Sequence, residues 1–125
     1  MIALDASALL AYLFRETGHE QVASFLGDSC LSTVNLSEVI GRFVRDGHDA
    51  HLVLKQILAT SIEIVPFSPE QAALAASLQP QTRPLGLSLA DRACLSLAMQ
   101  RNIAAATADR VWQGVQAGIQ VIVIR

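Results

Sequence analysis

The chain has 125 residues, near the commonest size of one domain, and no linker or low-complexity tract divides it, so we expect residues 1–125 to form a single domain. Hydrophobic residues make up 52% and charged residues 16% of the sequence, a composition that excludes disorder and leaves apolar surface for a partner. The net charge of −2 is not the basic footprint of many nucleic-acid binders, although every basic residue except Lys55 is arginine, which suits phosphate contacts.

The first half of the sequence alternates short apolar runs with helical patterns. The expected order is strand, helix, helix, strand, helix, helix, over residues 2–5, 6–14, 17–27, 30–33, 34–45 and 49–59. The second helix opens with Thr17-Gly18-His19-Glu20, a capping box in which the threonine and glutamate side chains satisfy free N–H groups of the first turn.

The second half continues the alternation and contains three more expected strands. Its strands are residues 62–65, 103–106 and 120–124, its helices are 68–78, 88–100 and 110–116, and residues 79–87 form the longest expected loop. Strands that alternate with helices favour a parallel sheet covered on both faces. Functional sites of such sheets lie at the carboxyl ends of the strands.

Two aspartates follow expected strands and precede helical segments. Asp5 ends the first strand, and Asp109 follows the strand at residues 103–106. Each could be an ordinary N-cap, which stabilises a helix by about 1 kcal/mol. If both strands belong to one parallel sheet, both carboxylates leave the same sheet edge.

Glu38 lies on the polar side of the helix at residues 34–45, together with Asn35, Arg42 and Arg45. One interpretation is a solvated face with a Glu38–Arg42 pair, worth a few tenths of a kcal/mol. The other is a carboxylate that takes part in a site with the strand-end aspartates.

Asp91 lies in the first turn of the helix that Ser88 caps, so it could simply complete that turn. Its helical neighbours Cys94, Leu95 and Ala98 are apolar, and the helix is apolar on nearly every side. A buried carboxylate requires a partner or a cation, because isolated charge is costly away from water. We therefore expect a functional role for Asp91.

These four acids would repel one another if the fold gathers them at one edge. Two carboxylates ~5 Å apart, at an effective dielectric of about 20, repel by about 3 kcal/mol. A divalent cation removes this repulsion, and oxygen-only ligands favour Mg²⁺ or Mn²⁺. Phosphodiester hydrolysis uses such a metal to activate water and neutralise charge. Four arginines near the acids in sequence are candidates for phosphate binding or for solvated surface: Arg42, Arg45, Arg92 and Arg110.

The sequence around each acid resembles a motif of the PIN-domain ribonucleases, particularly the VapC-type toxins of type II toxin–antitoxin systems. The four segments are Leu4-Asp5-Ala6-Ser7-Ala8-Leu9-Leu10-Ala11-Tyr12-Leu13, Ser32-Thr33-Val34-Asn35-Leu36-Ser37-Glu38-Val39, Gly86-Leu87-Ser88-Leu89-Ala90-Asp91-Arg92-Ala93-Cys94-Leu95-Ser96-Leu97-Ala98 and Thr107-Ala108-Asp109-Arg110-Val111-Trp112. They occur in the family's order and extend over the whole chain.

This resemblance implies a three-layer α/β/α PIN-like fold with a central parallel sheet of about five strands, and Mg²⁺- or Mn²⁺-dependent cleavage of RNA. The family's metal-site acids correspond to Asp5, Glu38, Asp91 and Asp109, and its site hydroxyls to Ser7 and Thr107. A homodimer inhibited by an antitoxin protein is also implied. Many relatives carry a further acid after the fourth motif, where this chain has Arg110, Val111 and Trp112, so the number of metal ions stays open.

The expected antitoxin groove lies near the N-terminus, with Leu9, Tyr12, Leu13 and Phe14 as candidate wall residues. Two other functions are weighed against the toxin ribonuclease. One is a non-catalytic PIN-like module that binds RNA or protein. The other is phosphotransfer through an aspartyl phosphate, which fits less well because Ser7 replaces the second acid and Lys55 is the only lysine.

The remaining features concern the cellular compartment. No run approaches 18 uncharged apolar residues, and the first residues lack the basic region of a signal peptide, so no membrane segment is expected. Cys30 and Cys94 lack metal-type spacing, so we expect two free buried thiols in a reducing cytoplasm.

Overall fold

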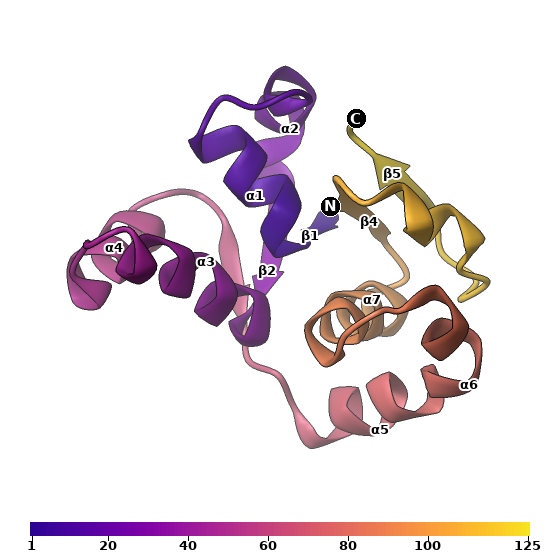
Figure 1. Ribbon diagram of the computed structural model, residues 1–125. Coiled ribbons are helices and arrows are strands. Elements are labelled where there is room, and N and C mark those ends of the chain that lie inside the picture. The colour runs from indigo at the N-terminus through magenta and orange to yellow at the C-terminus, as the bar shows by residue number, and fades with distance from the viewer.

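Five short parallel strands form the centre of the computed structural model, which describes residues 1–125 (Figure 1). Their spatial order is β3-β2-β1-β4-β5. The strands are β1 (Ile2–Leu4), β2 (Ser29–Ser32), β3 (Glu63–Val65), β4 (Ala104–Thr107) and β5 (Val121–Val123). The predicted α/β fold with a parallel sheet of about five strands is confirmed.

Helices cover both faces of this sheet. One layer contains α1 (Ala6–Leu13), α2 (His19–Phe25), α3 (Thr33–Arg45) and α4 (Ala50–Leu58). The other contains α5 (Pro69–Ser77), α6 (Gln79–Thr82) and α7 (Leu89–Arg101) (Figure 1). Three short 3₁₀ helices complete the chain: η1 (Leu26–Asp28), η2 (Arg83–Leu85) and η3 (Arg110–Gly114). No helix has both the length and the apolar character needed to cross a bilayer.

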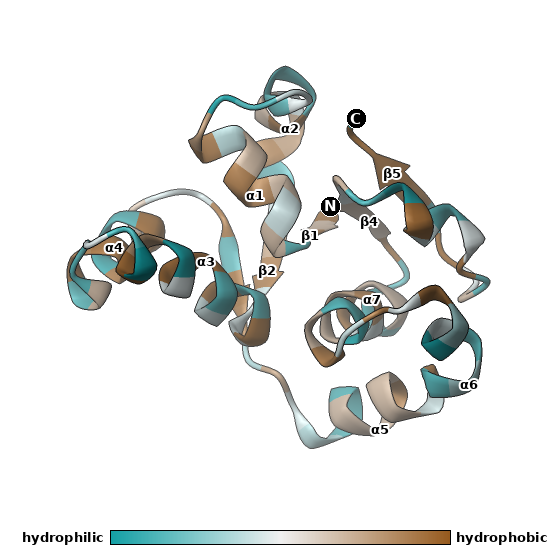
Figure 2. Ribbon diagram, viewed as in Figure 1, coloured by the Kyte–Doolittle hydropathy of each residue, from teal (hydrophilic) through white to brown (hydrophobic).

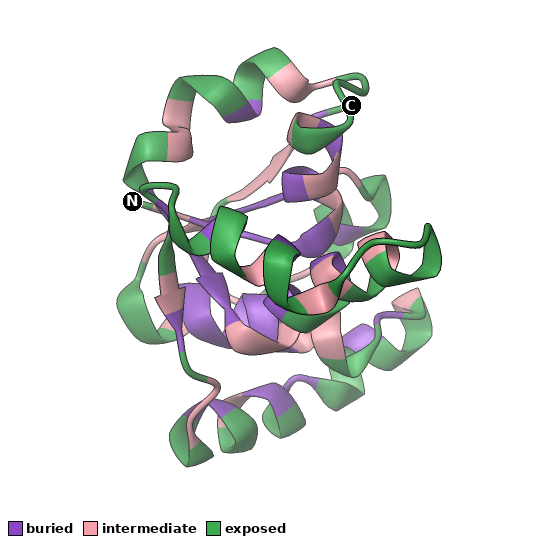
Figure 3. Cartoon of the chain, turned by 90° about the vertical axis from the view of Figure 1, so that its left-hand side faces the viewer, coloured by how far each residue is buried: buried purple, intermediate pink, exposed green.

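The two hydrophobic cores follow from the alternation of side chains along each strand. Leu4 of β1 and Leu31 of β2 pack into the core beneath α1 to α4, whereas Ala3 and Cys30 pack into the core beneath α7. The inner strands β1, β2 and β4 are accordingly mostly buried and apolar, the edge strands β3 and β5 are only partly buried, and the outer helices are largely exposed (Figures 2 and 3). Residues 93–98 of α7 are completely enclosed, as expected for a central helix.

Two local predictions from sequence are wrong. Thr17 does not cap α2: the N-cap is Gly18, with a left-handed φ of 96° and no side-chain cap bond. A Cβ at Gly18 would collide with the carbonyl oxygen of Ile124, so a contact distant in sequence requires this glycine. Residues 79–87 are not mainly loop but contain α6 and η2, because Pro80 and Pro84 lie in first turns, where proline is tolerated.

The strand order reverses its direction of winding between β1 and β4. From β1 the chain runs outward to β2 and β3, then returns to the other side of β1 to form β4 and β5. In open parallel sheets, ligands bind where the direction of winding reverses. Asp5 and Thr107 both lie at this reversal point.

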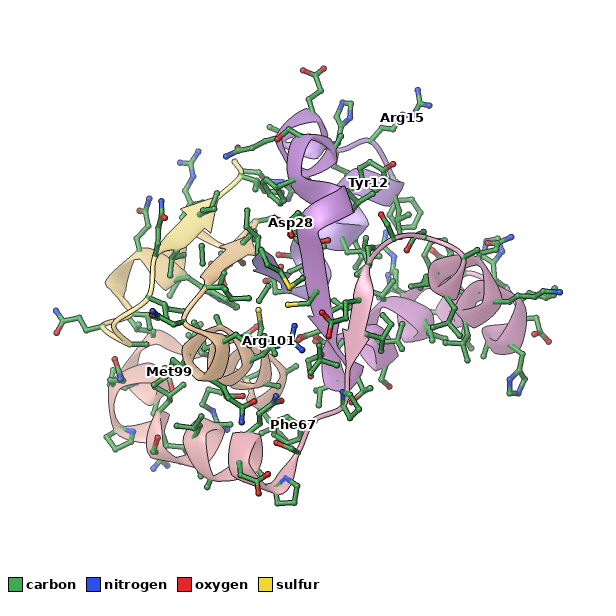
Figure 4. The ribbon with its side chains drawn as sticks, turned by 180° about the vertical axis from the view of Figure 1, so that it is seen from behind. Tyr12, Arg15, Asp28, Phe67, Met99 and Arg101 are labelled. Atoms are coloured by element: carbon green, nitrogen blue, oxygen red, sulfur yellow. The ribbon has the colours of Figure 1, made fainter.

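The opposite edge of the sheet carries charges that are already paired. Arg101, at the end of α7, forms two hydrogen bonds with the carboxylate of Glu63, at 2.7 and 2.8 Å. The amino terminus lies 3.2 Å from a carboxylate oxygen of Asp28 (Figure 4). The charged groups at the amino ends of the strands are thus paired with opposite charges, whereas the acids at the carboxyl ends of β1 and β4 are not.

Candidate active site

Asp5 is the most enclosed carboxylate of the protein. It directly follows β1, is only 4% exposed, and is the N-cap of α1, where its Oδ1 accepts a 2.7 Å hydrogen bond from the backbone N–H of Ala8. The capping interpretation of the sequence is therefore correct. It does not exclude a further role, because the second carboxylate oxygen is held by groups from another strand.

Two hydroxyls hold this carboxylate in place. Thr107, at the end of β4, donates a 2.6 Å hydrogen bond to Asp5 Oδ2, and the Ser7 hydroxyl lies 2.7 and 2.9 Å from the two carboxylate oxygens. Ser7 in turn accepts a 2.9 Å bond from the backbone N–H of Ala108. The network fixes Asp5 between the ends of β1 and β4.

Burial raises the pKa of Asp5 to about 6. Hydrogen bonds from Thr107, Ala8 and Ser7 act against the desolvation by stabilising the ionised form, and the negative charge of Asp91 adds to the increase. A buried carboxyl whose pKa is raised toward neutrality, at the carboxyl end of a parallel strand, is a property that functional sites share.

Asp91 has two roles in the geometry. Its Oδ2 accepts a 2.8 Å bond from the backbone N–H of Ser88, and the Ser88 side chain accepts from the N–H of Asp91, which completes a capping box at the start of α7. The same carboxylate raises the pKa of both Asp5 and Glu38. It is thus a helix cap whose charge reaches the two other acids.

Glu38 is oriented by Asn35, which the sequence placed only on a polar helix face. The side-chain amide of Asn35 donates 3.0 Å bonds to Glu38 Oε1 and to the carbonyl oxygen of Ala90, and so joins α3 to the first turn of α7. Asn35 is only 1% exposed, and its Oδ1 is buried without a partner. Partial burial raises the pKa of Glu38, the bond from Asn35 opposes this, and Asp91 adds to it.

Asp109 is placed differently from the other three acids. It is exposed and caps η3, with Oδ1 accepting a 3.0 Å bond from the N–H of Val111. Its backbone N–H donates to Thr107 Oγ1, the same hydroxyl that holds Asp5. Asp109 therefore adjoins the site through its backbone, while its carboxylate faces solvent.

The four candidate arginines do not hydrogen-bond to any of these acids. Arg42 pairs with Asp46 at 3.4 Å, not with Glu38, and its guanidinium lies over the ring of Phe14; Arg45 also approaches Asp46. Arg92 donates to the carbonyl oxygen of Ala75. Arg110 donates to the carbonyl oxygen of Arg125.

The donor chemistry of the site fits a hard divalent cation. Its side chains offer only oxygen ligands, and mutual repulsion already affects Asp5 and Glu38. No three Asp, Glu, His or Cys side chains are grouped closely enough to hold one ion together. An ion would thus take one or two carboxylates directly and complete its shell with water, as Mg²⁺ commonly does.

The family model of the PIN domain matches residues 2–117, and the chain belongs to this family. FitAcB from Neisseria gonorrhoeae is similar over 99% of this chain and 98% of that chain, with 20% identity and a TM-score of 0.72. A toxin–antitoxin complex from Klebsiella pneumoniae is similar over 99% and 97%, with 16% identity and a TM-score of 0.75.

VapBC2 from Rickettsia felis, whose crystal structure contains a DNA fragment from the VapBC2 promoter, is similar over 97% of both chains, with 16% identity and a TM-score of 0.72. Likeness at these identities demonstrates a shared fold. No curated protein matches the chain in sequence.

Proposed function

We propose that this protein is a metal-dependent endoribonuclease that cleaves RNA phosphodiester bonds, and the toxin component of a toxin–antitoxin pair. The observation that carries the proposal is the enclosure of Asp5 between the ends of β1 and β4, where Ser7 and Thr107 hold it, with its pKa raised to about 6 in part by the negative charge of Asp91. Membership of the PIN domain family and the fold shared with toxin–antitoxin complexes support it.

Each residue of the site has a distinct task in this proposal. Asp5, Asp91 and Glu38 supply the negative charge that attracts the cation, one or two of them as direct ligands, and Asp109, whose carboxylate faces solvent, adds charge rather than a direct ligand. Ser7 and Thr107 keep Asp5 in one orientation, and their hydrogen bonds favour its ionised form. A bound Mg²⁺ or Mn²⁺ would supply activation of water and neutralisation of phosphate charge.

Phosphotransfer through Asp5 fits the structure less well. The position two residues after Asp5, where an aspartyl-phosphate mechanism would need a second acid, is Ser7, whose hydroxyl hydrogen-bonds to the Asp5 carboxylate. The groups that most affect the pKa of Asp5 include hydroxyls, an amide and a carboxylate, but no lysine. The alternative function is a non-catalytic module that binds RNA or protein. A measurement of RNA cleavage distinguishes it from the ribonuclease.

The antitoxin groove and the homodimer belong to the same proposal. Leu9 is 1% exposed and part of the core, so its assignment as a groove wall was wrong, whereas Leu13 and Phe14 are exposed. A small apolar cavity of about 80 Å³ lies beside them, lined by Leu13, Phe43, Val53, Gln56, Ile57 and Thr60. Tyr12 and Arg15 lie at the same end of α1 (Figure 4). An apolar antitoxin segment would fit this surface.

The two cysteines support action in a reducing cytoplasm. Cys30 and Cys94 are both buried and both free. Burial raises the pKa of each thiol, so neither is a reactive thiolate.

Incubation of the pure protein with end-labelled structured RNA tests the proposal. We expect cleavage with Mn²⁺ or Mg²⁺ and none after addition of EDTA, and the thermal unfolding temperature should rise with either metal, because an ion that binds only the folded state stabilises it. Ca²⁺-free buffer with EDTA is the control for both readouts. RNA binding without cleavage under any metal would favour the non-catalytic module, and an unchanged unfolding temperature at millimolar metal would contradict the metal site.

A further inference from the structure

A polar cavity of about 410 Å³ lies between α6, η2 and the first turn of α7. Its lining comes from α6, η2 and the first turn of α7: Gln79, Thr82, Arg83, Gly86, Leu87 and Arg92. Only one of these side chains is hydrophobic, and none is acidic. Gly86 has a left-handed φ of 72°, and no atom lies within 4 Å of the position of a Cβ, so the backbone is open to a ligand there.

The two arginines of this cavity have no acidic partner. Arg42, Arg45, Arg101 and Arg125 form ion pairs with carboxylates, but Arg83 and Arg92 do not. Arg92 is half-buried, and one of its guanidinium nitrogens donates to the carbonyl oxygen of Ala75. This bond anchors the side chain without neutralising its charge. The cavity therefore combines two cations that have no acidic partner with the side-chain amide of Gln79, while the Thr82 hydroxyl already donates to the carbonyl oxygen of Leu78.

The first turn of α7 joins this cavity to the acids. On one side of the turn, Asn35 of α3 binds the carbonyl oxygen of Ala90 and orients Glu38. On the other side, Arg92 binds α5 through Ala75. Asp91, between Ala90 and Arg92, folds its carboxylate back onto the N–H of Ser88. A single extended chain that crosses this turn would contact acids on one side and arginines on the other.

We propose that the cavity holds a backbone phosphate of the RNA substrate, at a nucleotide next to the one that occupies the acid site. This inference rests on the proposed ribonuclease function. Guanidinium groups bind phosphate oxygens in a bidentate manner, and the side-chain amide of Gln79 offers a further donor. The site is independent of base identity, because phosphate contacts position a nucleic acid without reading its sequence.

Salt-dependent binding of a fluorescent single-stranded RNA, measured by anisotropy in EDTA, tests the proposal. For single strands, the slope of log affinity against log salt changes by about 0.7 for each phosphate neutralised. Arg83→Gln should weaken binding and reduce the slope by up to about this amount. Arg92→Gln should do the same, with thermal unfolding recorded because it also loses the bond to Ala75. Lys55→Gln, which removes an exposed cation of α4, is the control and should keep the parental slope.

The possible results distinguish the phosphate site in the cavity from the ribonuclease function on which it rests. A reduced slope for both arginine variants, with a parental slope for Lys55→Gln, supports the phosphate site. If the parent binds and cleaves RNA but Arg83→Gln keeps the parental slope, the cavity assignment is wrong and the ribonuclease function stands. If the parent binds no RNA in EDTA but cleaves it with Mn²⁺, the cavity assignment alone is wrong, and if it neither binds RNA in EDTA nor cleaves it with Mn²⁺ or Mg²⁺, both are wrong. Equal slope losses in all three variants would mean diffuse charge attraction and would also overturn the site.

Discussion

An aspartate follows both β1 and β4, but one of the two carboxylates is buried and the other is exposed. Asp5 and Asp109 each follow an apolar strand and each cap the helical turn that comes next. Asp5 is 4% exposed and held by Ser7 and Thr107, whereas Asp109 is exposed. Asp5 directly follows β1, whereas one residue, Ala108, separates Asp109 from the end of β4. A strand-end aspartate becomes an enclosed site group only where neighbouring elements cover it.

The largest expected difference between these two ends is in RNA cleavage. Asp5→Asn should lower the rate of metal-dependent cleavage about 100-fold or more, because it removes the enclosed charge that the site is built around. Asp109→Asn should lower it less, since its carboxylate faces solvent. Initial rates on labelled RNA with Mn²⁺ measure both, with Glu70→Gln as a charge-matched exposed control. Equal losses in the two aspartate variants would break the comparison.

The second difference is in the pH dependence of stability without metal. The folded pKa of Asp5, about 6, exceeds the ordinary value of 3.8 for an aspartate, so between these values the native state binds more protons than the unfolded state. The contribution of Asp5 to the free energy of unfolding should therefore be greatest below pH 4. It should decrease by up to about 3 kcal/mol as the pH rises through 6.

Urea unfolding in EDTA between pH 4 and pH 7 measures this dependence. Asp5→Asn should lose most of the decrease, and Asp109→Asn should keep it. The raised pKa of Glu38 acts in the same direction and accounts for a smaller remaining part. A decrease that persists unchanged in Asp5→Asn would show that another group causes it.

The smallest expected effect concerns the cap at the β4 end. Asp109→Ala removes the acceptor for the N–H of Val111 and should cost about 1 kcal/mol or less of stability. Asp109→Asn keeps an acceptor and should recover most of that loss, which distinguishes capping from charge. Thermal unfolding of the two variants in EDTA provides the measurement; a larger loss for Asn than for Ala would be inconsistent with a capping role.

Much of the site was visible in sequence because its residues lie at element boundaries. Asp5, Ser88 and Asp91 have the spacing of caps, and the structure contains these caps. Asn35 was missed as a positioning residue, although its i,i+3 spacing to Glu38 on one helix face was available. Its burial depends on the approach of α7, whose Ala90 accepts its second hydrogen bond, and no local pattern predicts that contact.

The sequence by itself determined the parallel α/β fold and the places where its acids leave the strands and helices, because hydrophobic periodicity and capping are local properties. Only the tertiary structure decided which acids interact. The return of the chain from β3 to β4 brought Thr107 onto Asp5, and the packing of α7 against α3 brought Asp91 near Glu38. Burial and Coulomb interactions depend on distances between elements far apart in the chain, so they distinguish Asp5 from Asp109 only after folding.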